Sequence, residues 1–317
     1  MRAVILGGTG AVGFATAMRL RARGWRVDVT ARGSGPVPAP MLAAGVAFHE
    51  LSRSDTTGIE RLVGAGADLL VDAVAFTGSD VRRLLPVLRS VSSTVLISSR
   101  AVYVDDRGRH VNGAERPDFA APVREDNPTL DPAGDRADPF TREGYAPCKV
   151  AAEHVARDSG LPVTVVRPAK IHGAWARNPR TRPFVERMLR GDPVLRLRGA
   201  DGPCDHLSAA ANLAALVERC ADVPGARVLN GADPGTPTVR TLLGSVGAEL
   251  AWQGDLQVGS GHEDALANPW DAVGGFALDT TASTRLGYAP VGTSVELVRE
   301  EVRWLRSGGG ASVPGLV

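Results

Sequence analysis

Short aliphatic runs alternate with amphipathic segments along the first half of the chain. The runs predict strands at 2–6, 26–31, 46–51, 68–74, 93–98 and 162–167, and the segments between them predict helices at 11–23, 57–65, 78–90 and 144–158. This alternation is typical of an α/β protein with a doubly wound parallel sheet. Such sheets bind ligands at the carboxyl ends of their strands, so we expect the functional site at that edge.

The second half follows a less regular pattern. Helices are predicted near 181–190, 208–221, 238–249 and 294–306, with short strands near 194–198 and 226–230. We expect a sheet domain at 1–170, a smaller lobe at 171–306 that is interleaved with it, and a flexible tail at 307–317. The stretch 104–143 is rich in Asp, Arg, Gly and Pro, and predicts either an irregular excursion over the site or a disordered surface loop.

Composition restricts the class of protein. The 317 residues are 44% apolar and 22% charged with a net charge of +1, which is typical of a soluble globular protein and shows no footprint for nucleic acid. Cys148, Cys204 and Cys220 have neither disulfide nor zinc-site spacing, so we expect no metal and a reducing, cytoplasmic setting. No apolar run reaches transmembrane length, and the strand that starts beside Met1 leaves no room for a signal peptide.

The first turn has the sequence AVILGGTGAVG, which places Gly7, Gly10 and Gly13 between a strand and a helix. Gly8, Gly10 and Gly13 also fit the G-x-G-x-x-G form. Small residues there let the backbone approach a pyrophosphate at the helix N-terminus, and Gly13 lets the helix pack close to the sheet. Because an aliphatic strand precedes the glycines and an amphipathic helix follows them, the motif predicts dinucleotide binding within 1–170.

The end of the second predicted strand indicates which dinucleotide binds. An acidic residue there would hold the ribose hydroxyls of NAD. The sequence RVDVTARG has Ala31 followed by Arg32 at that place, while Asp28 lies inside the strand. A guanidinium pairs well with a 2′-phosphate. We therefore predict NADP(H) in preference to NAD(H); the alternative is that Arg32 is a solvated loop residue.

Tyr145 and Lys149 form a Y-x-x-x-K pair at the start of a predicted helix. Positions i and i+4 share a helix face, so both side chains point into one site. A fixed positive charge beside a phenol favours its ionised form, which suits Tyr145 for exchanging a proton with a carbonyl or alcohol oxygen. Ser99 ends the fifth strand and could bond the same oxygen. Ser98 is its neighbour, and periodicity does not choose between them.

These pieces together resemble the extended short-chain dehydrogenase/reductase family, that is, the NAD-dependent epimerase/dehydratase group. The matching stretches are GGTGAVG (7–13), SSRAVY (98–103), REDNP (124–128), YAPCK (145–149) and RPAKIHG (167–173). The resemblance implies a Rossmann fold with a smaller C-terminal substrate lobe and a small-molecule substrate. It also implies homodimers formed through the helices at 78–90 and 144–158.

The resemblance implies roles for individual residues. Ser99, Tyr145 and Lys149 match the catalytic set, and the last two also match cofactor-binding positions. The other matches to the cofactor site are Thr9, Gly10, Ala11 and Val12 in the pyrophosphate loop, Ala73, Val74 and Ala75 beside the adenosine and ribose, and Pro168 and Ile171 at the nicotinamide wall.

Other positions depart from the pattern of that family. Arg100 and Ala101 stand where the dehydratases of the family carry an Asp and a Glu that serve elimination, so water elimination by that route is not expected. Cys204 stands where epimerases usually have an Arg that grips a nucleotide diphosphate. Lys170 and His172 are unusual in the nicotinamide-wall segment.

Two groups of charged residues are candidates for substrate contacts. Arg100, Lys170 and His172 would suit an anionic or polyhydroxylated substrate if they face the cleft; the alternative is salt bridging to acids in the long loop. For the arginines in ARNPRTRP we favour solvated loop positions over phosphate contacts. These are Arg177, Arg180 and Arg182.

Three functions are compatible with these residues. The first is net carbonyl–alcohol oxidoreduction with NADP(H) on a sugar-like or secondary-metabolite substrate, and the intact Ser99, Tyr145 and Lys149 support it. The second is epimerisation of a nucleotide sugar with a retained cofactor, which uses the same residues. The third is a non-catalytic nucleotide-sensing or RNA-binding protein, because one fold hosts many functions.

Overall fold

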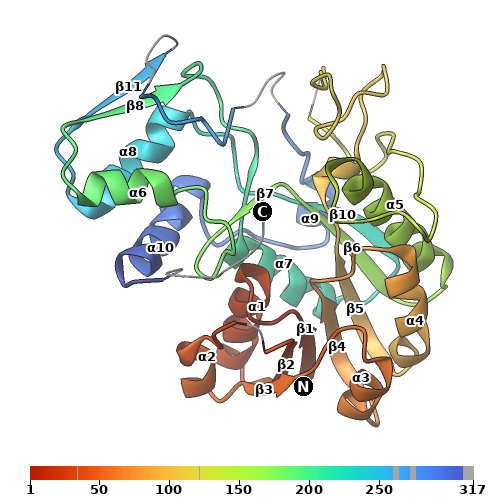
Figure 1. The fold of residues 1–317 in the computed structure, drawn as a ribbon. Coiled ribbons are helices and arrows are strands. Elements are labelled where there is room, and N and C mark those ends of the chain that lie inside the picture. Colours follow the sequence, from red (N-terminus) through yellow and green to blue (C-terminus); the bar gives the residue numbers. More distant parts are fainter. Residues whose placement is uncertain (34, 121, 260–263, 272–275, 310–317) are drawn as a thin grey trace.

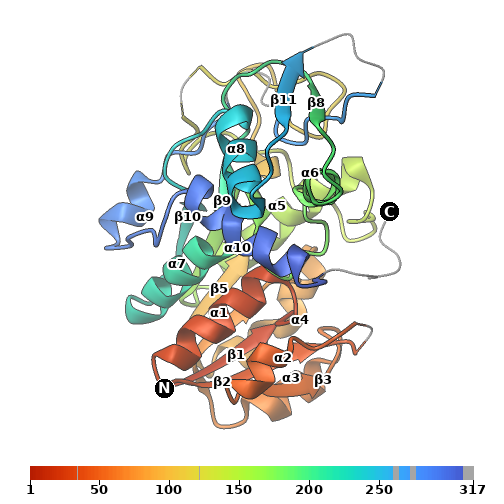
Figure 2. The same ribbon diagram turned by 90° about the vertical axis from the view of Figure 1, so that its left-hand side faces the viewer.

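A parallel sheet forms the centre of the protein, with helices on both faces and a smaller lobe beside it (Figures 1 and 2). The structure, a computed structural model, describes residues 1–33, 35–120, 122–259, 264–271 and 276–309. Residues 310–317 of the predicted tail lie outside the described residues.

The sheet has seven strands in the order β10-β6-β5-β4-β1-β2-β3, and every neighbouring pair is parallel. The strands are β1 (Arg2–Leu6), β2 (Arg26–Ala31), β3 (Ala47–Glu50), β4 (Ala67–Asp72), β5 (Val91–Ile97), β6 (Val163–Pro168) and β10 (Arg227–Gly231). The predicted doubly wound parallel fold is confirmed. The order of strands reverses between β1 and β4, and a sheet of this kind opens its ligand crevice at such a point.

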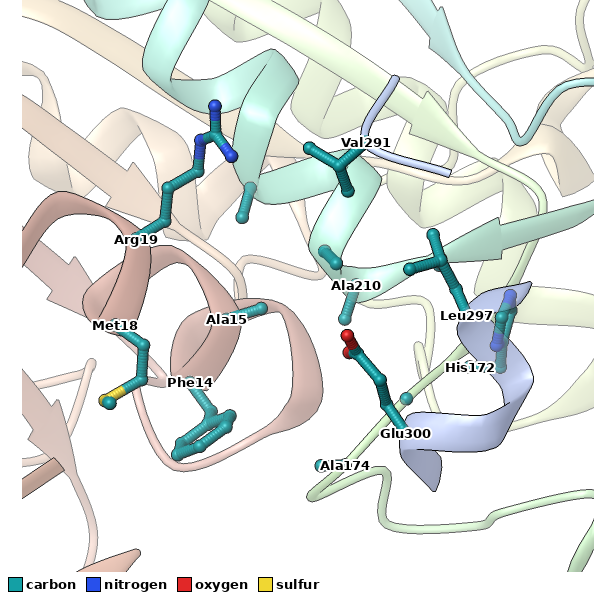
Figure 3. Close-up of a pocket in the computed structure, with 14 residues that line it drawn as sticks. Phe14, Ala15, Met18, Arg19, His172, Ala174, Ala210, Val291, Leu297 and Glu300 are labelled. Atoms are coloured by element: carbon teal, nitrogen blue, oxygen red, sulfur yellow. The ribbon is translucent and has the colours of Figure 1, made fainter. Parts of the chain in front are cut away.

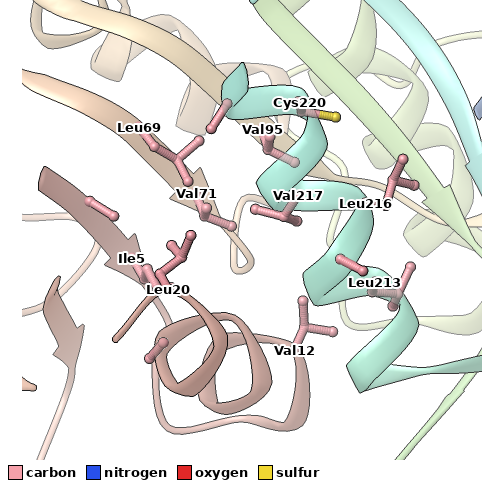
Figure 4. Packing of buried hydrophobic residues seen from close by; sticks show 14 of the residues in the cluster. Ile5, Val12, Leu20, Leu69, Val71, Val95, Leu213, Leu216, Val217 and Cys220 are labelled. Carbon is pink, nitrogen blue, oxygen red and sulfur yellow. The ribbon is translucent and has the colours of Figure 1, made fainter. Parts of the chain in front are cut away.

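Alternate residues of the buried strands face opposite layers of helices. Ala3 and Ile5 belong to a core shared with α1 (Ala11–Ala22) and α7 (Ala210–Asp222), which Figure 4 shows on one face of the sheet. Val4 and Leu6 belong to the core on the other face. The helices of that layer are α3 (Thr56–Val63), α4 (Gly78–Leu88) and α5 (Arg142–Asp158).

The smaller lobe has its own apolar core, which includes Phe184, Leu195, Leu243 and Val298. It is built from α6 (Arg182–Leu189), β8 (Val194–Arg198), α8 (Val239–Leu250), β11 (Asp255–Gly259) and α10 (Ser294–Arg306), with β8 paired to β11. A second pair, β7 (Lys170–His172) and β9 (Leu207–Ala209), lies where the chain leaves the sheet for this lobe. Because α7 and β10 come from the second half of the chain, both halves supply the central sheet layer.

All the predicted strands and helices are present, with ends displaced by a few residues. The structure adds short elements that were not predicted: α2 (Ala39–Ala43), η1 (Arg100–Val102), β7, β9, β11 and α9 (Thr281–Arg285). Most of these elements are too short to show a periodic pattern, and tertiary contacts decide them.

Candidate active site

The glycine-rich turn after β1 has the geometry of an anion cradle. Gly7 has a φ of 82°, and a Cβ on Gly13 would lie 2.6 Å from both the carbonyl oxygen of Gly7 and the Cα of Gly8, so a side chain there would clash. Beside Gly10, by contrast, a Cβ would meet only the Gly7 oxygen at 3.9 Å. The N-terminus of α1 has no side-chain cap and no acidic residue in its first turn.

The turn therefore fits a pyrophosphate. The first amides of a helix have no partner within the helix, and here no side chain of α1 takes them, so they are available to an anion. Thr9, Ala11 and Val12 lie in this turn and in the first turn of α1. The amides of Gly7 and Gly8 both donate to the Thr30 oxygen at 3.0 Å, which fixes the turn against β2.

The ends of β2 and β3 form the side of the site expected to hold the adenosine. Asp28 is unavailable to a ligand because it pairs with Arg2 at 3.0 Å and with His49 at 2.9 Å. Arg32 follows β2 and is exposed, without an ion pair to any described residue. Glu50, which the sequence interpretation missed, ends β3 opposite Ala31, and its carboxylate lies where a Cβ on Gly33 would fall, 2.4 Å away.

The segment after β4 closes the site next to the glycine turn. The Ala73 amide donates to the Leu6 oxygen at 3.1 Å, and a Cβ on Gly7 would lie 2.5 Å from a methyl group of Val74. The backbone of residues 73–75 is thus held against the first turn. The Ala75 oxygen accepts a hydrogen bond from Lys149.

Lys149 is buried and ties α5 to the ends of two strands. Its Nζ donates to the carbonyl oxygens of Ala75 at 2.7 Å and Ile97 at 3.0 Å. The same Nζ lies 5.9 Å from the ring centre of Tyr145. An ammonium has three N–H donors, and the third has no oxygen or nitrogen partner among the described residues, although the Nζ lies closer to the ring centre of Phe76, at 4.7 Å, than to that of Tyr145.

The structure separates the two serines after β5. Ser98 is buried and gives its hydroxyl to Glu153 of α5, which also forms an ion pair with Arg167 of β6. Ser99 is partly exposed, and its Oγ accepts from the Ala101 amide at 3.1 Å, so its own proton is free for another acceptor. Ser99 is therefore the serine whose hydroxyl can reach a ligand.

A cleft of about 680 Å³ brings many of the expected residues together. Ser99, Tyr145, Pro168 and Ile171 all line it. Ligand sites for small molecules are typically about 300–1,000 Å³. The charged residues of the same cleft are Arg100, Arg116, Arg142, Lys170, Arg180, Asp205 and Asp271.

The irregular segment before α5 forms one wall of this cleft through residues 111–114, Arg116 and Pro117. Asp105 fixes the segment because its carboxylate accepts the backbone amides of Arg107, Arg109 and Asp118, each at 2.9 Å. Burial raises the pKa of Asp105, but these amides outweigh burial and hold it below its ordinary range. Of the two interpretations of 104–143, the lining of the cleft supports the excursion over the site.

Arg100 and Lys170 line the cleft and share one carboxylate. Arg100 forms a two-pronged ion pair with Asp205, and the Lys170 Nζ lies 2.9 Å from the same carboxylate. The Arg100 guanidinium also stacks over the Phe276 ring at 4.5 Å. Their common partner is thus Asp205 and not an acid of the long loop. Cys204, next to it, is a neutral thiol, because burial and the charge of Asp205 raise its pKa to about 12, and it cannot replace an arginine as a cation.

Arg180 also lines the cleft, so its interpretation as a solvated loop residue was wrong. It is partly buried, and its guanidinium donates to the Ile171 oxygen at 3.1 Å. Arg177, in the same loop, is exposed, and Arg182 lies 3.8 Å from Glu186.

His172 does not line the cleft, so the proposal that it contacts substrate needs correction. Its side chain is buried, and its Nε2 lies 2.9 Å from Asp233. It faces a smaller, mainly apolar cavity of about 210 Å³ between α1, α7 and α10, where Figure 3 shows it near Leu297. The bond to the buried Asp233 holds His172 on this side, whereas its neighbours Lys170 and Ile171 line the cleft.

The chain matches the model of the NAD dependent epimerase/dehydratase family over residues 3–209. None of the curated proteins matched the sequence. Among the described residues, no helix is both long and apolar enough to cross a membrane.

Solved structures share the fold over nearly the whole chain. A UDP-glucose 4-epimerase of Thermotoga maritima, with UDP-glucose, is 19% identical and covers 97% of this chain and 99% of its own, with a TM-score of 0.69. A UDP-glucose-4-epimerase of Stenotrophomonas maltophila, with NAD and formylated UDP-arabinopyranose, is 16% identical and covers 98% of this chain and 100% of its own, with a TM-score of 0.73. A UDP-glucose 4-epimerase of Thermus thermophilus, with NAD, is 20% identical and covers 96% of this chain and 99% of its own, with a TM-score of 0.70.

Proposed function

The chain belongs to the NAD-dependent epimerase/dehydratase family, and from this premise we propose that it is an NADP(H)-dependent oxidoreductase acting on a carbonyl or alcohol group. The observation that carries the proposal is the meeting of Ser99 and Tyr145 in one cleft, with the buried Lys149 beside Tyr145. Membership of the family identifies an enzyme. The non-catalytic alternative is therefore not carried forward.

Each of the three residues has one chemical task. The phenol of Tyr145 gives its proton to the carbonyl oxygen in reduction, or takes it from the alcohol in oxidation. Ser99 donates a hydrogen bond to the same oxygen and stabilises the charge that develops on it. Lys149 supplies a positive charge beside the phenol, and its bonds to two strand-end carbonyls hold it in place.

The cofactor would lie along the edge of the sheet. The glycine turn at residues 7–13 would hold its pyrophosphate, the backbone of residues 73–75 the adenosine-side ribose, and Pro168 and Ile171 its nicotinamide. When bound, it would exchange a hydride with the substrate carbon. Pro168 and Ile171 would give this end of the cofactor an apolar wall.

Preference for NADP(H) rests on Arg32, which is exposed and available to a 2′-phosphate. Glu50 is the group that would oppose it, because its carboxylate lies beside Gly33 in the next turn. Titration of the protein with NADPH and NADH, followed by the fluorescence of the nicotinamide, tests the preference. Arg32→Ala should weaken NADPH binding only, and Glu50→Gln should strengthen it. Tighter binding of NADH by the native protein would contradict the proposal.

Turnover is tested with NADPH and a panel of sugar-like and other ketones. Tyr145→Phe should reduce NADPH consumption by about 10²–10⁴-fold while the variant still binds NADPH. Tyr103→Phe is the matched control, since the Tyr103 hydroxyl is buried and bonded to Asn230 at 2.7 Å, away from the cleft. Equal turnover by Tyr145→Phe and the native enzyme would refute the role of Tyr145.

Epimerisation of a nucleotide sugar is the second candidate. It uses the same three residues, and the named epimerases share the fold. A protein that purifies with oxidised cofactor and interconverts sugar nucleotides without net NADPH consumption would favour this function over reduction.

Two further expectations accompany the proposal. A cytoplasmic location is supported by Cys148, Cys204 and Cys220, which are all free and buried. A homodimer formed through α4 and α5, which pack against each other on one face of the sheet, is supported by the family resemblance. Sedimentation of the purified chain measures the second of these directly.

A further inference from the structure

We propose that Phe76 is a positioning residue for the Tyr145–Lys149 pair, and that its ring holds the Lys149 ammonium beside the Tyr145 phenol. Phe76 lies between β4 and α4, and it is not among the residues that line the cleft. The inference rests on the proposed function for its effect on turnover, because Phe76 acts through the other two residues. The contacts of its ring do not depend on that function and are tested separately.

The first argument is the environment of the ammonium. Lys149 is 4% exposed and forms no ion pair with a described residue, and a buried charge needs partners. Carbonyl oxygens of Ala75 and Ile97 accept two of its hydrogen bonds, and the centre of the Phe76 ring lies 4.7 Å from Nζ. The face of an aromatic ring is negative and attracts a cation within about 6 Å of the ring centre. The ring is thus a third partner of the ammonium.

The second argument is that the same ring contacts the phenol. The ring centres of Phe76 and Tyr145 are 6.3 Å apart, and the planes meet at 61° in an edge contact. Aromatic pairs favour this geometry at such distances. The Lys149 Nζ lies 5.9 Å from the ring centre of Tyr145, farther than from that of Phe76. One side chain therefore contacts both members of the pair, and the spacing of ammonium and phenol depends on it.

The third argument is that Phe76 is fixed relative to α5. Its amide donates to the Asp80 carboxylate at 3.0 Å, and Thr77 and Asp80 form a reciprocal cap at the start of α4. A Cβ on Gly78 would lie only 3.1 Å from the carbonyl oxygen of Ala151, so the start of α4 packs closely on α5. Groups that are fixed before ligands bind act without the cost of reorganisation.

Phe140 provides a matched control for the ring. It packs against Phe76 with the ring centres 5.3 Å apart, and it is 74% exposed. Within the described part of the chain, its ring contacts neither the Tyr145 ring nor the Lys149 ammonium. Loss of the Phe140 ring therefore changes the same aromatic cluster and leaves the catalytic pair with its partner.

Fluorinated phenylalanines at position 76 test the electrostatic role of the ring. One, two or three fluorine atoms make its face progressively less negative and leave its size almost unchanged, so a ring that only fills space would tolerate them. We expect kcat for ketone reduction by NADPH to fall stepwise with each fluorine. Phe76→Leu should lower kcat by about 2–30-fold and still bind NADPH. Phe140→Leu should stay within about twofold of the native kcat.

A nuclear magnetic resonance measurement tests the contact without turnover. Lys149 and Lys170 are the two lysines of the chain, so protein labelled with ¹³C-lysine gives two ε-methylene signals, which Lys170→Arg assigns. The ring current of Phe76 should shift the Lys149 signal upfield. Phe76→Leu should move this signal downfield, while Phe140→Leu should leave it in place. The Lys170 signal is the internal reference in both variants.

Two results would overturn the role of Phe76: the Lys149 signal stays in place in Phe76→Leu, or kcat is the same throughout the fluorinated series. If Phe76→Leu does not fold, Phe76→Met, with a side chain of similar volume, replaces it in both measurements. Failure of the proposed function is seen separately, as a native protein that reduces no ketone with NADPH. In that case the Lys149 signal still decides whether Phe76 holds the ammonium.

Discussion

Ser98 and Glu153 are joined by a hydrogen bond from hydroxyl to carboxylate, and this contact commits Ser98 to the protein interior. Tyr145, Lys149 and Glu153 occupy successive turns on one face of α5. Tyr145 lines the cleft, Lys149 binds the strand ends and Glu153 binds Ser98 and Arg167. One helix face thus carries both residues of the proposed catalytic pair and the carboxylate that holds Ser98 and Arg167 in the interior.

The two serines should respond differently to substitution. Ser99→Ala removes a donor to the reacting oxygen and should lower kcat by about 10²–10³-fold. It also removes the acceptor of the Ala101 amide, a partly exposed contact that should cost less stability than the buried Ser98 contact. Ser98→Ala leaves the buried Glu153 carboxylate with one donor fewer and should cost about 1–3 kcal/mol of unfolding free energy. Steady-state kinetics and urea unfolding on both variants check this. A large kcat loss confined to Ser98→Ala would reverse the assignment.

Glu153→Gln should destabilise the protein strongly. It removes the carboxylate that pairs with the buried Arg167 guanidinium, whose Nη2 lies 2.5 Å from it. Loss of one partner of a buried pair costs about 3–5 kcal/mol, because the remaining charge has no counterion. Urea unfolding measures the change. Glu143→Gln, at an exposed position in the first turn of the same helix, is the control and should change the free energy by less than about 1 kcal/mol. Equal losses of unfolding free energy in Glu153→Gln and Glu143→Gln would contradict a special role for the buried pair of Glu153 and Arg167.

Alanine substitutions at Gly10 and Gly13 should have different effects, one on NADPH binding and the other on stability. A methyl group on Gly13 meets backbone atoms at 2.6 Å, so Gly13→Ala should lower the stability of the ligand-free protein by about 1–3 kcal/mol. Gly10→Ala meets nothing closer than 3.9 Å and should fold normally, but its methyl group occupies space beside the helix N-terminus and should weaken NADPH binding. Thermal unfolding and NADPH titration distinguish the two. Normal NADPH affinity in Gly10→Ala would argue against pyrophosphate at this turn.

The pair of His172 and Asp233 should make stability depend on pH. Burial lowers the pKa of His172, but the hydrogen bond and charge of Asp233 outweigh it and raise the pKa above 6.5. The stabilisation is therefore complete below pH 6.5 and is lost as the pH rises through the raised value. Burial raises the pKa of Asp233, yet His172 and other donors hold it below 3.8, so its contribution is present above pH 3.8 and is lost as the pH falls through the lowered value.

Unfolding free energies measured from pH 5 to 9 check this expectation. Above pH 6.5, the unfolding free energy of the native protein should fall by at most about 1.4 kcal/mol per pH unit because of this pair. In His172→Gln this dependence on pH should be weaker. His154→Gln, at an exposed position on α5, should keep it. If the unfolding free energy of His172→Gln falls above pH 6.5 as steeply as that of the native protein, the group that loses its proton is not His172.

Local pattern was enough for the strands of the sheet and for the pairing of Tyr145 with Lys149 on one helix. The aliphatic runs gave β1 to β6, and the i, i+4 spacing of Tyr145 and Lys149 placed both on the inner face of α5. These features depend on backbone geometry within a few residues, which periodicity reports directly. The choice between Ser98 and Ser99 needed Glu153, which is far away in the chain and close only in the fold.

Ion-pair partners were beyond the reach of the sequence. Arg100, Lys170 and Asp205 meet because β5, β7 and the turn before β9 converge on one cleft, and the same convergence puts Arg180 into its wall and His172 outside it. The order of residues by itself determined which elements form and which chemical groups are available. Only the tertiary structure decided which charges are paired and which stay free, because pairing depends on distance and burial between segments that the chain keeps far apart.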